Sequence, residues 1–148
     1  MSKPQPETLD SLMAQNCHLH HMRAHQLFEA IGLYRGQPPV LFALWEREGQ
    51  TQTELAEKLR IAPATITKML QRMEKTGFVQ RRPDAEDQRI SRVYLTEAGH
   101  NVQSQVEAVW KTMEAETFAH ITEEERVVLH RFLLQIRQNL LHATGEGA

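Results

Sequence analysis

Apolar residues recur at helical spacing near both ends of the 148-residue chain. They predict a first helix over about residues 9–31, a long helix over about 96–118 and a last helix over about 122–145. The last helix has more apolar side chains than a small domain can cover, namely Val128, Leu129, Phe132, Leu133, Ile136, Leu140 and Leu141. We therefore expect the first and last helices to bury each other across the two-fold axis of a homodimer.

Between these segments the pattern predicts three shorter helices. Gly36 and the prolines after it break the chain and open one helix, which Gly49 closes; its apolar side should pack against the back of the elements that follow. Thr51 and Glu54 then form a T-x-x-E capping box, in which each side chain satisfies a backbone N–H at the start of a helix.

A tight turn over residues 60–62 leads to another helix, and Pro63 suits its first position because proline has no N–H to lose there. Ala62 stands where a capping Ser, Thr, Asp or Asn is usual. Apolar residues follow at the spacing of one buried stripe, and Gly77 ends the helix; the stripe is Ile66, Met69, Leu70 and Met73. Two helices joined in this way predict a helix-turn-helix, whose second helix enters the major groove of DNA.

Two β-prone runs, residues 78–82 and 90–95, flank a polar turn over 83–89 and predict a hairpin. The hairpin would be the wing of a winged helix-turn-helix. The fold class is therefore mainly α with a small β-wing, and both chain ends would supply a helical dimerisation module. We divide the chain into residues 1–35 and 98–148 for dimerisation and residues 36–97 for DNA binding.

The charge distribution supports a nucleic-acid partner, although the formal net charge of the whole chain is −2. Residues 60–92 contain eight basic and four acidic side chains, a local charge of +4 on an acidic body. A basic surface of this kind is expected where one face of a protein meets phosphates, although a solvated charged face would give the same count.

Composition and motifs exclude several other classes of protein. With 41% hydrophobic and 24% charged residues, the chain is typical of globular domains, and it has neither a signal-peptide pattern nor an apolar run that could cross a membrane. One cysteine excludes an internal disulfide framework and fits the reducing cytoplasm. There is no G-x-S-x-G, phosphate loop or H-E-x-x-H, so we expect neither an enzyme nor a cofactor.

Three runs resemble the MarR family of bacterial transcriptional regulators: T-E-L-A-E-K-L, A-T-I-T-K-M-L-Q-R-M-E-K-T-G-F-V, and D-Q-R-x-x-x-V-Y-L-T followed by E-A-G. The resemblance implies a homodimer that binds a pseudo-palindromic double-stranded DNA operator. Family members commonly act as repressors and are released by small aromatic or phenolic acids bound between the dimer helices and the winged domain. The wing aspartate of the family supports the wing arginine, and Asp87 and Arg89 match these positions.

The candidate DNA-binding residues lie on the recognition helix and the wing, with Arg89 at the wing tip as the strongest candidate for a minor-groove contact. For Arg81, Arg82 and Arg92, phosphate contacts and simple outward strand positions are equally compatible with the sequence. The full set is Pro63, Ala64, Thr65, Thr67, Lys68, Gln71, Arg72, Arg81, Arg82, Arg89 and Arg92, with Asp87 as the wing support.

Other residues are candidates for sensing. An effector crevice could be lined by Arg23, Phe28, Tyr34, Phe42 and Trp45, with Arg23 as a carboxylate partner, although a plain hydrophobic core explains the aromatic residues equally well. The remaining candidates are the histidines His18, His21 and His25, which share one face of the first helix, and the neighbouring Cys17.

Zinc ligands and a redox-active thiol would make the protein a metal- or redox-responsive regulator. We prefer a polar helix face without metal and a buried, inert cysteine. A winged-helix module that binds another protein is a further alternative to an operator-binding regulator.

Overall fold

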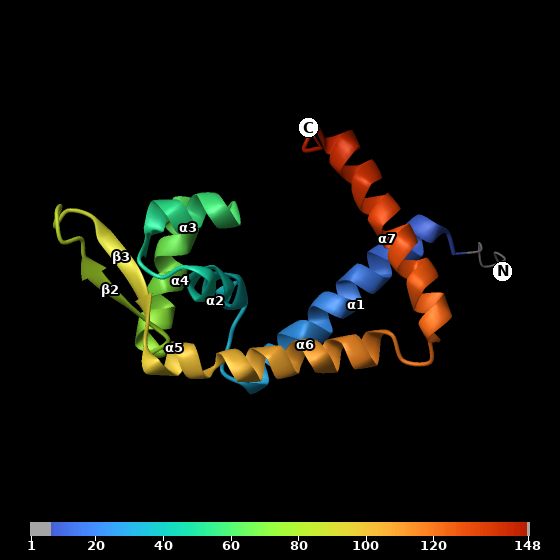
Figure 1. The fold of residues 1–148 in the computed structure, drawn as a ribbon, viewed down its shortest axis with the longest axis horizontal. Helices are drawn as coiled ribbons and strands as arrows, with labels where there is room; N and C mark the ends of the chain where they lie inside the picture. The colour runs from blue at the N-terminus through green and yellow to red at the C-terminus, as the bar shows by residue number, and fades with distance from the viewer. Residues whose placement is uncertain (1–6, 148) are drawn as a thin grey trace, which may run out of the picture. The chain divides into compact units, whose positions relative to one another are not determined.

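The computed structural model describes residues 7–147 and is mainly helical with one small sheet (Figure 1), as the sequence predicts. The chain forms two compact units that meet between Met113 and Glu114, and each is described by itself. The elements are α1 (Leu9–Ala30), α2 (Gln37–Glu46), β1 (Gln50–Thr51), α3 (Gln52–Leu59), α4 (Pro63–Lys75), β2 (Val79–Pro83), β3 (Ser91–Leu95), α5 (Glu97–Asn101), α6 (Gln103–Thr117) and α7 (Glu123–Thr144).

The core of the first unit lies between α2, the helix-turn-helix and the sheet. Its fully buried side chains come from all of these elements: Leu41, Leu44, Leu55, Ile66, Leu70, Met73 and Val93. Each buried leucine or isoleucine contributes about 1.5–3 kcal/mol through its removal from water. The predicted packing of α2 behind the helix-turn-helix is confirmed, and so is the buried stripe of α4, in which Met69 is half-buried.

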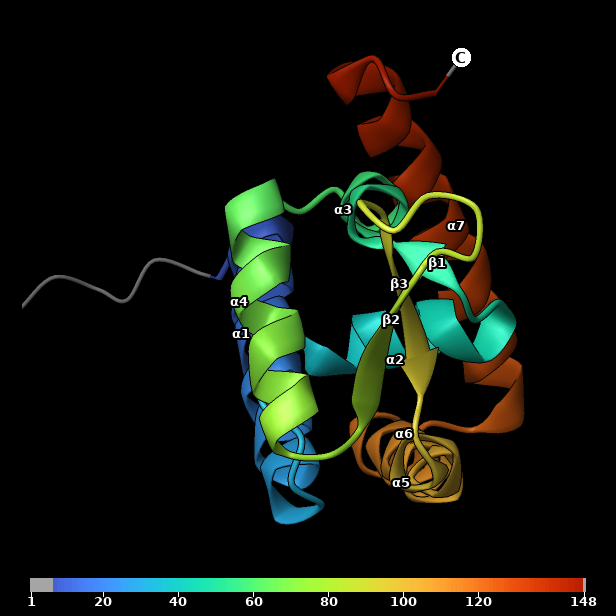
Figure 2. The ribbon, with the colours of Figure 1, turned by 90° about the vertical axis from the view of Figure 1, so that its left-hand side faces the viewer.

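The predicted hairpin is present as β2 and β3, which pair antiparallel with Arg81 opposite Val93. A strand that the sequence did not predict, β1, pairs with β3 on the other side, so the strand order is β1-β3-β2 (Figure 2). It is too short for an alternating pattern to appear in the sequence. Just before it, Gly49 adopts a positive φ of 74°, and a β-carbon there would lie 3.2 Å from the Tyr94 hydroxyl.

Beyond the wing, the predicted long helix is interrupted, which corrects the expectation of one continuous helix. Thr96 caps α5, and α6 begins after Val102. Gly99 is the glycine of the E-A-G run, and its position leaves no room for a side chain: a β-carbon there would lie 2.1 Å from the Phe78 carbonyl oxygen. The Gly99 carbonyl also accepts a hydrogen bond of 2.9 Å from Trp45 Nε1, which attaches α5 to α2.

The first and last helices both end in defined caps. Thr8 caps the start of α1, because its hydroxyl accepts from the Ser11 N–H at 3.1 Å. At the far end of the chain, Gly145 caps α7 in the left-handed conformation at φ 74°.

The second unit contains α7, and a capping box of Thr122 and Glu125 starts this helix. Arg126 fastens the preceding turn by donating to the Phe118 carbonyl at 2.9 Å and the Ile121 carbonyl at 3.2 Å. None of the α7 residues is buried in the single chain, so its apolar side remains accessible over its whole described length. In residues 7–147 no helix is both long and apolar enough to span a bilayer.

Candidate nucleic-acid interface

The recognition helix α4 presents one polar side to solvent. The turn before it is closed by the Ile61 N–H, which donates to the Ala56 carbonyl at 3.0 Å, and by Arg60 in the left-handed conformation at φ 52°. Pro63 takes the first helical position, and Ala62 provides no side-chain cap, as predicted. The predicted contact residues on this helix are all exposed except Thr67, which is half-buried: Pro63, Ala64, Thr65, Lys68, Gln71 and Arg72.

An open groove of about 580 Å³ follows the C-terminal half of α4 and reaches the wing. Four basic side chains and one acidic side chain line it, together with Gln71: Lys68, Arg72, Lys75, Arg81 and Glu74. Clustered cations beside a groove raise the local concentration of anions, so this side of α4 favours approach of a phosphate backbone.

The side chain of Arg81, on wing strand β2, contacts α4 and α3 rather than pointing outward. Its Nε forms an ion pair with Glu74 of α4, and its Nη1 donates to Gln52 of α3 at 2.7 Å. Only 26% of the side chain is exposed. Direct phosphate contact by Arg81 stays a prediction, but the structure gives the residue a role inside the protein that the sequence did not indicate.

At the wing tip Asp87 holds Arg89 through two parallel hydrogen bonds, from Nε and Nη2, each of 3.0 Å. The Arg89 N–H also donates to Asp87 at 3.1 Å. These bonds, above all the one from the guanidinium, keep the pKa of Asp87 below its ordinary value. The Arg89 side chain is nevertheless 91% exposed. The Asp87–Arg89 pair that the resemblance implies is therefore present, and it orients a guanidinium that is exposed to solvent.

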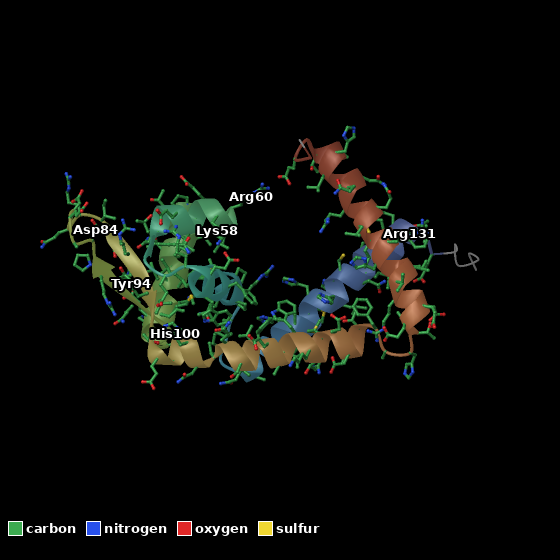
Figure 3. The ribbon with its side chains drawn as sticks, viewed as in Figure 1. Lys58, Arg60, Asp84, Tyr94, His100 and Arg131 are labelled. Carbon is green, nitrogen blue, oxygen red and sulfur yellow. The ribbon has the colours of Figure 1, made fainter. Side chains whose placement is uncertain are left out.

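The turn of the wing is organised by Asp84, which Figure 3 shows toward the tip of the hairpin. It accepts from Arg92 Nε at 2.6 Å and from the N–H groups of Glu86 and Asp87 at 3.1 Å each. The hydrogen bond from Arg92 is the main reason that the pKa of Asp84 is lowered.

Two more wing arginines differ in their surroundings. Arg92 donates to the Gly49 carbonyl at 2.8 Å in addition to its bond with Asp84, so its guanidinium connects the wing to β1. Arg82 is exposed and lies over the ring of Tyr94, 4.6 Å from the centroid. Arg82 is therefore the more accessible of the two for a phosphate, since Arg92 uses Nε and Nη1 for bonds within the protein.

Among the effector candidates, the structure brings three of the four aromatic residues together and adds Trp110, which the sequence analysis missed. Phe28 and Trp110 meet edge to face at 5.4 Å between centroids, as do Phe42 and Trp45, and Phe42 lies 6.3 Å from Trp110. We call Phe28, Phe42, Trp45 and Trp110 the aromatic cluster. Trp110 belongs to α6 and is 40% exposed.

The other two effector candidates lie outside these ring contacts. Tyr34 is half-exposed, and no ring contact of its own is seen within residues 7–147. Arg23 donates to Gln26 at 3.2 Å on the same helix. Their part in an effector site stays a prediction.

The candidate sensing residues on α1 do not form an assembled site. In the described part of the chain, no three His, Cys, Asp or Glu side chains come together as a metal site, and His25 pairs with Glu29 at 3.4 Å. Cys17 is exposed in the single chain, so the expectation of a buried cysteine is wrong there.

A capped helix-turn-helix followed by a hairpin with an exposed arginine at its tip defines a winged helix-turn-helix DNA-binding domain. The family model described as MarR family matches residues 33–91. The HTH-type transcriptional regulator TtmR of Methylorubrum extorquens (strain PA1) is 30% identical over 150 aligned positions, covering 95% of this chain and 73% of TtmR. The chain belongs to the MarR family and is a DNA-binding transcriptional regulator, not an enzyme.

Solved structures agree with this fold. A mutant of S. aureus MepR superposes with a TM-score of 0.80 at 24% identity, covering 90% of this chain and 98% of that one. A second MepR mutant, bound to an oligodeoxyribonucleotide, superposes with a TM-score of 0.66 over the same shares of the two chains, also at 24% identity.

Proposed function

We propose that the protein is a homodimeric repressor that binds a pseudo-palindromic operator and is released from it by a small aromatic or phenolic acid. The observation that carries the proposal is the pairing of an exposed cationic side of α4 with an exposed Arg89 that Asp87 directs. A solved MepR mutant bound to an oligodeoxyribonucleotide supports DNA as the ligand class.

In this proposal α4 lies in the major groove and the wing reaches the adjacent minor groove. Gln71 has the donor and acceptor to pair with adenine, and Lys68 can reach guanine or a phosphate. Arg89 enters the minor groove, where narrow A·T-rich segments concentrate negative potential. Two copies related by a two-fold axis place their recognition helices about one helical turn apart, roughly 34 Å.

The proposed division of labour assigns residues 36–97 to DNA binding and residues 1–35 and 98–148 to pairing of the subunits. The uncovered apolar side of α7 supports it, because no described residue of that helix is buried in the single chain. Contiguous exposed apolar surface of this kind marks an interaction site.

A salt titration tests the DNA-binding part of the proposal. We expect Lys68→Ala to weaken binding and to reduce the slope of log K against log salt by about one unit, because one phosphate contact releases about one counterion. Lys111→Ala is the matched control, since Lys111 is an exposed lysine of α6 and should leave the slope unchanged. Equal slopes for both variants would remove Lys68 from the interface, and a salt-independent wild type would favour the protein-binding module.

The aromatic cluster provides a direct test of the effector. The chain has two tryptophans, Trp45 and Trp110, and both belong to the cluster, so selectively excited tryptophan fluorescence reports on it alone. We expect 2-hydroxybenzoate to change this fluorescence and to release operator DNA over the same concentration range, because a ligand that prefers the non-binding conformation shifts the population toward it.

Phenol is the comparison ligand, and Arg23→Met is the matched variant for the carboxylate partner. The variant should lower affinity for 2-hydroxybenzoate and leave that for phenol unchanged, since only the acid has a group that arginine pairs with. A fluorescence change without loss of operator binding would contradict release by this ligand class.

A further inference from the structure

The side chain of Gln52 connects three elements of the winged domain, although no sequence pattern distinguishes it. Gln52 is the first residue of α3. Its Nε2 donates to Thr67 Oγ1 on α4 at 2.9 Å, and its Oε1 accepts from Arg81 Nη1 on β2 at 2.7 Å. The amide has one donor side and one acceptor side, so a single residue can serve both partners.

The chain of polar contacts continues on either side of Gln52 and returns to α4 at both ends. Thr67 Oγ1 donates to the Pro63 carbonyl at 2.9 Å, and Arg81 Nε pairs with Glu74. We call Gln52, Thr67, Arg81 and Glu74 the bridge network. All four residues are half-buried, which strengthens their hydrogen bonds relative to a fully solvated surface.

The bridge network commits groups that would otherwise be free for DNA. A threonine hydroxyl has one proton, and that of Thr67 goes to Pro63 while the oxygen accepts from Gln52. Donation by the Thr67 hydroxyl to a base or a phosphate would require breaking its bond to the Pro63 carbonyl. Thr65 lies on the same helix, is fully exposed, and remains available for such a contact.

The position of the bridge network allows it to fix the angle between α4 and the wing. The covalent link between α4 and the wing runs through residues 76–78, at the C-terminal end of the recognition helix. Thr67 lies eight residues before Lys75, about 12 Å along the helix axis. A link at one end leaves a hinge, whereas a second attachment two turns away fixes the angle between α4 and β2.

We propose that Gln52 is a positioning residue that fixes the wing relative to the recognition helix, so that α4 and Arg89 meet the two grooves of one duplex together. The inference rests on the proposed operator binding and deepens it. Holding both contacts in place before binding removes the free-energy cost of ordering the wing on the DNA.

Two substitutions of Thr67 separate this role from a direct contact of its methyl group with thymine. Thr67→Val keeps the shape and loses the hydroxyl, whereas Thr67→Ser keeps the hydroxyl and loses the methyl. We expect Thr67→Val to weaken operator binding by about five- to tenfold and Thr67→Ser to bind within about twofold of wild type, since a lost internal hydrogen bond has an effect of this order. A direct contact with a thymine methyl predicts the reverse order, which would overturn the proposal.

Gln52→Leu removes both hydrogen bonds at similar side-chain volume and should weaken operator binding by about tenfold. In the double variant, Thr67→Val should cause little further loss of affinity, because both substitutions act through one network. Gln103→Leu is the matched control: it makes the same change at the first position of α6 and should have no effect. Full additivity of Gln52→Leu and Thr67→Val would contradict a shared network.

The decisive comparison combines Gln52 with Arg89, whose side chains are in different parts of the winged domain. Arg89→Ala should cost much less affinity in the Gln52→Leu background than in wild type, because the wing is no longer held where Arg89 can act. A role of Gln52 in folding stability alone would leave the contribution of Arg89 unchanged and would refute the positioning role. Failure of wild type to bind operator DNA would instead refute the proposed function, and this inference with it.

Discussion

Replacing Phe132 with aspartate is expected to convert the proposed homodimer into a monomer and to weaken binding to a two-half-site operator by about a hundredfold or more, because the second half-site then loses its tethered partner. Phe132 is 50% exposed on the apolar side of α7, where the single chain buries nothing. A carboxylate placed in a subunit interface without a partner costs several kcal/mol by order of magnitude. Sedimentation equilibrium measures the assembly, and fluorescence anisotropy with labelled operator measures the affinity.

Gln138→Asp is the matched control for this substitution, since it introduces the same charge on the same helix. At 3.6 residues per turn, Gln138 lies on the side of α7 opposite to the apolar residues around Phe132. The Gln138→Asp variant should remain dimeric and bind the operator with wild-type affinity. If the Phe132 variant stayed dimeric, or became monomeric without losing affinity, then α7 would not be the element that pairs the recognition helices.

Arg89→Ala should weaken operator binding by about ten- to a hundredfold at fixed salt, the loss expected for one well-placed arginine contact. The wing holds this guanidinium in a fixed direction through Asp87, so the contact loses little side-chain entropy on binding. Arg89→Lys keeps the charge and loses the planar pair of bonds, and it should fall between alanine and wild type. Anisotropy titrations at a single salt concentration compare the three proteins.

Arg82→Ala is the matched control in the wing, because Arg82 is also an exposed arginine but lies over Tyr94 rather than at the tip. Arg82→Ala should lower operator affinity by less than about tenfold, as expected for the loss of a single exposed phosphate contact. Replacing A·T pairs with G·C pairs opposite the wing should weaken wild type and leave Arg89→Ala nearly unaffected. Equal sensitivity of both proteins to that replacement would argue against minor-groove insertion by Arg89.

The parts of the fold that local chemistry determines were predictable from the sequence. The capping boxes at Thr51 and Thr122, the proline at the start of α4 and the glycine after its end all act within a few residues. The buried stripe of α4 and the two strands of the hairpin follow from the periodicity of their side chains. Such local features are sufficient to locate the recognition helix and the wing tip along the chain.

The features that depend on distant contacts were not predictable. β1 exists because two residues happen to pair with β3, and nothing in two residues signals a strand. Trp110 joins the aromatic cluster through side chains of α1 and α2 that are far away in sequence. The bridge network connects Gln52 with Arg81 across 29 positions, so its polar residues resemble ordinary helix surface or DNA contacts in the sequence.

The exposure of Cys17 is also a tertiary effect. Cysteine is among the residue types most often buried, but Leu12, Met13, Leu19 and Met22 of the same helix are also exposed in the single chain, as the apolar residues of α7 are. Pairing of subunits would cover such surfaces. The exposed thiol is therefore consistent with the same assembly that the Phe132 variant tests.

The spacing of half-sites tests the central claim most directly, namely that paired subunits present two recognition helices and two wings to one face of a duplex. An operator is first selected from random fragments by the purified protein, and binding is then measured after inserting about 5 base pairs, half a helical turn, between its half-sites. We predict one dimer per operator and loss of most of the specific affinity with that insertion. Unchanged affinity for the operator with the insertion would contradict the account.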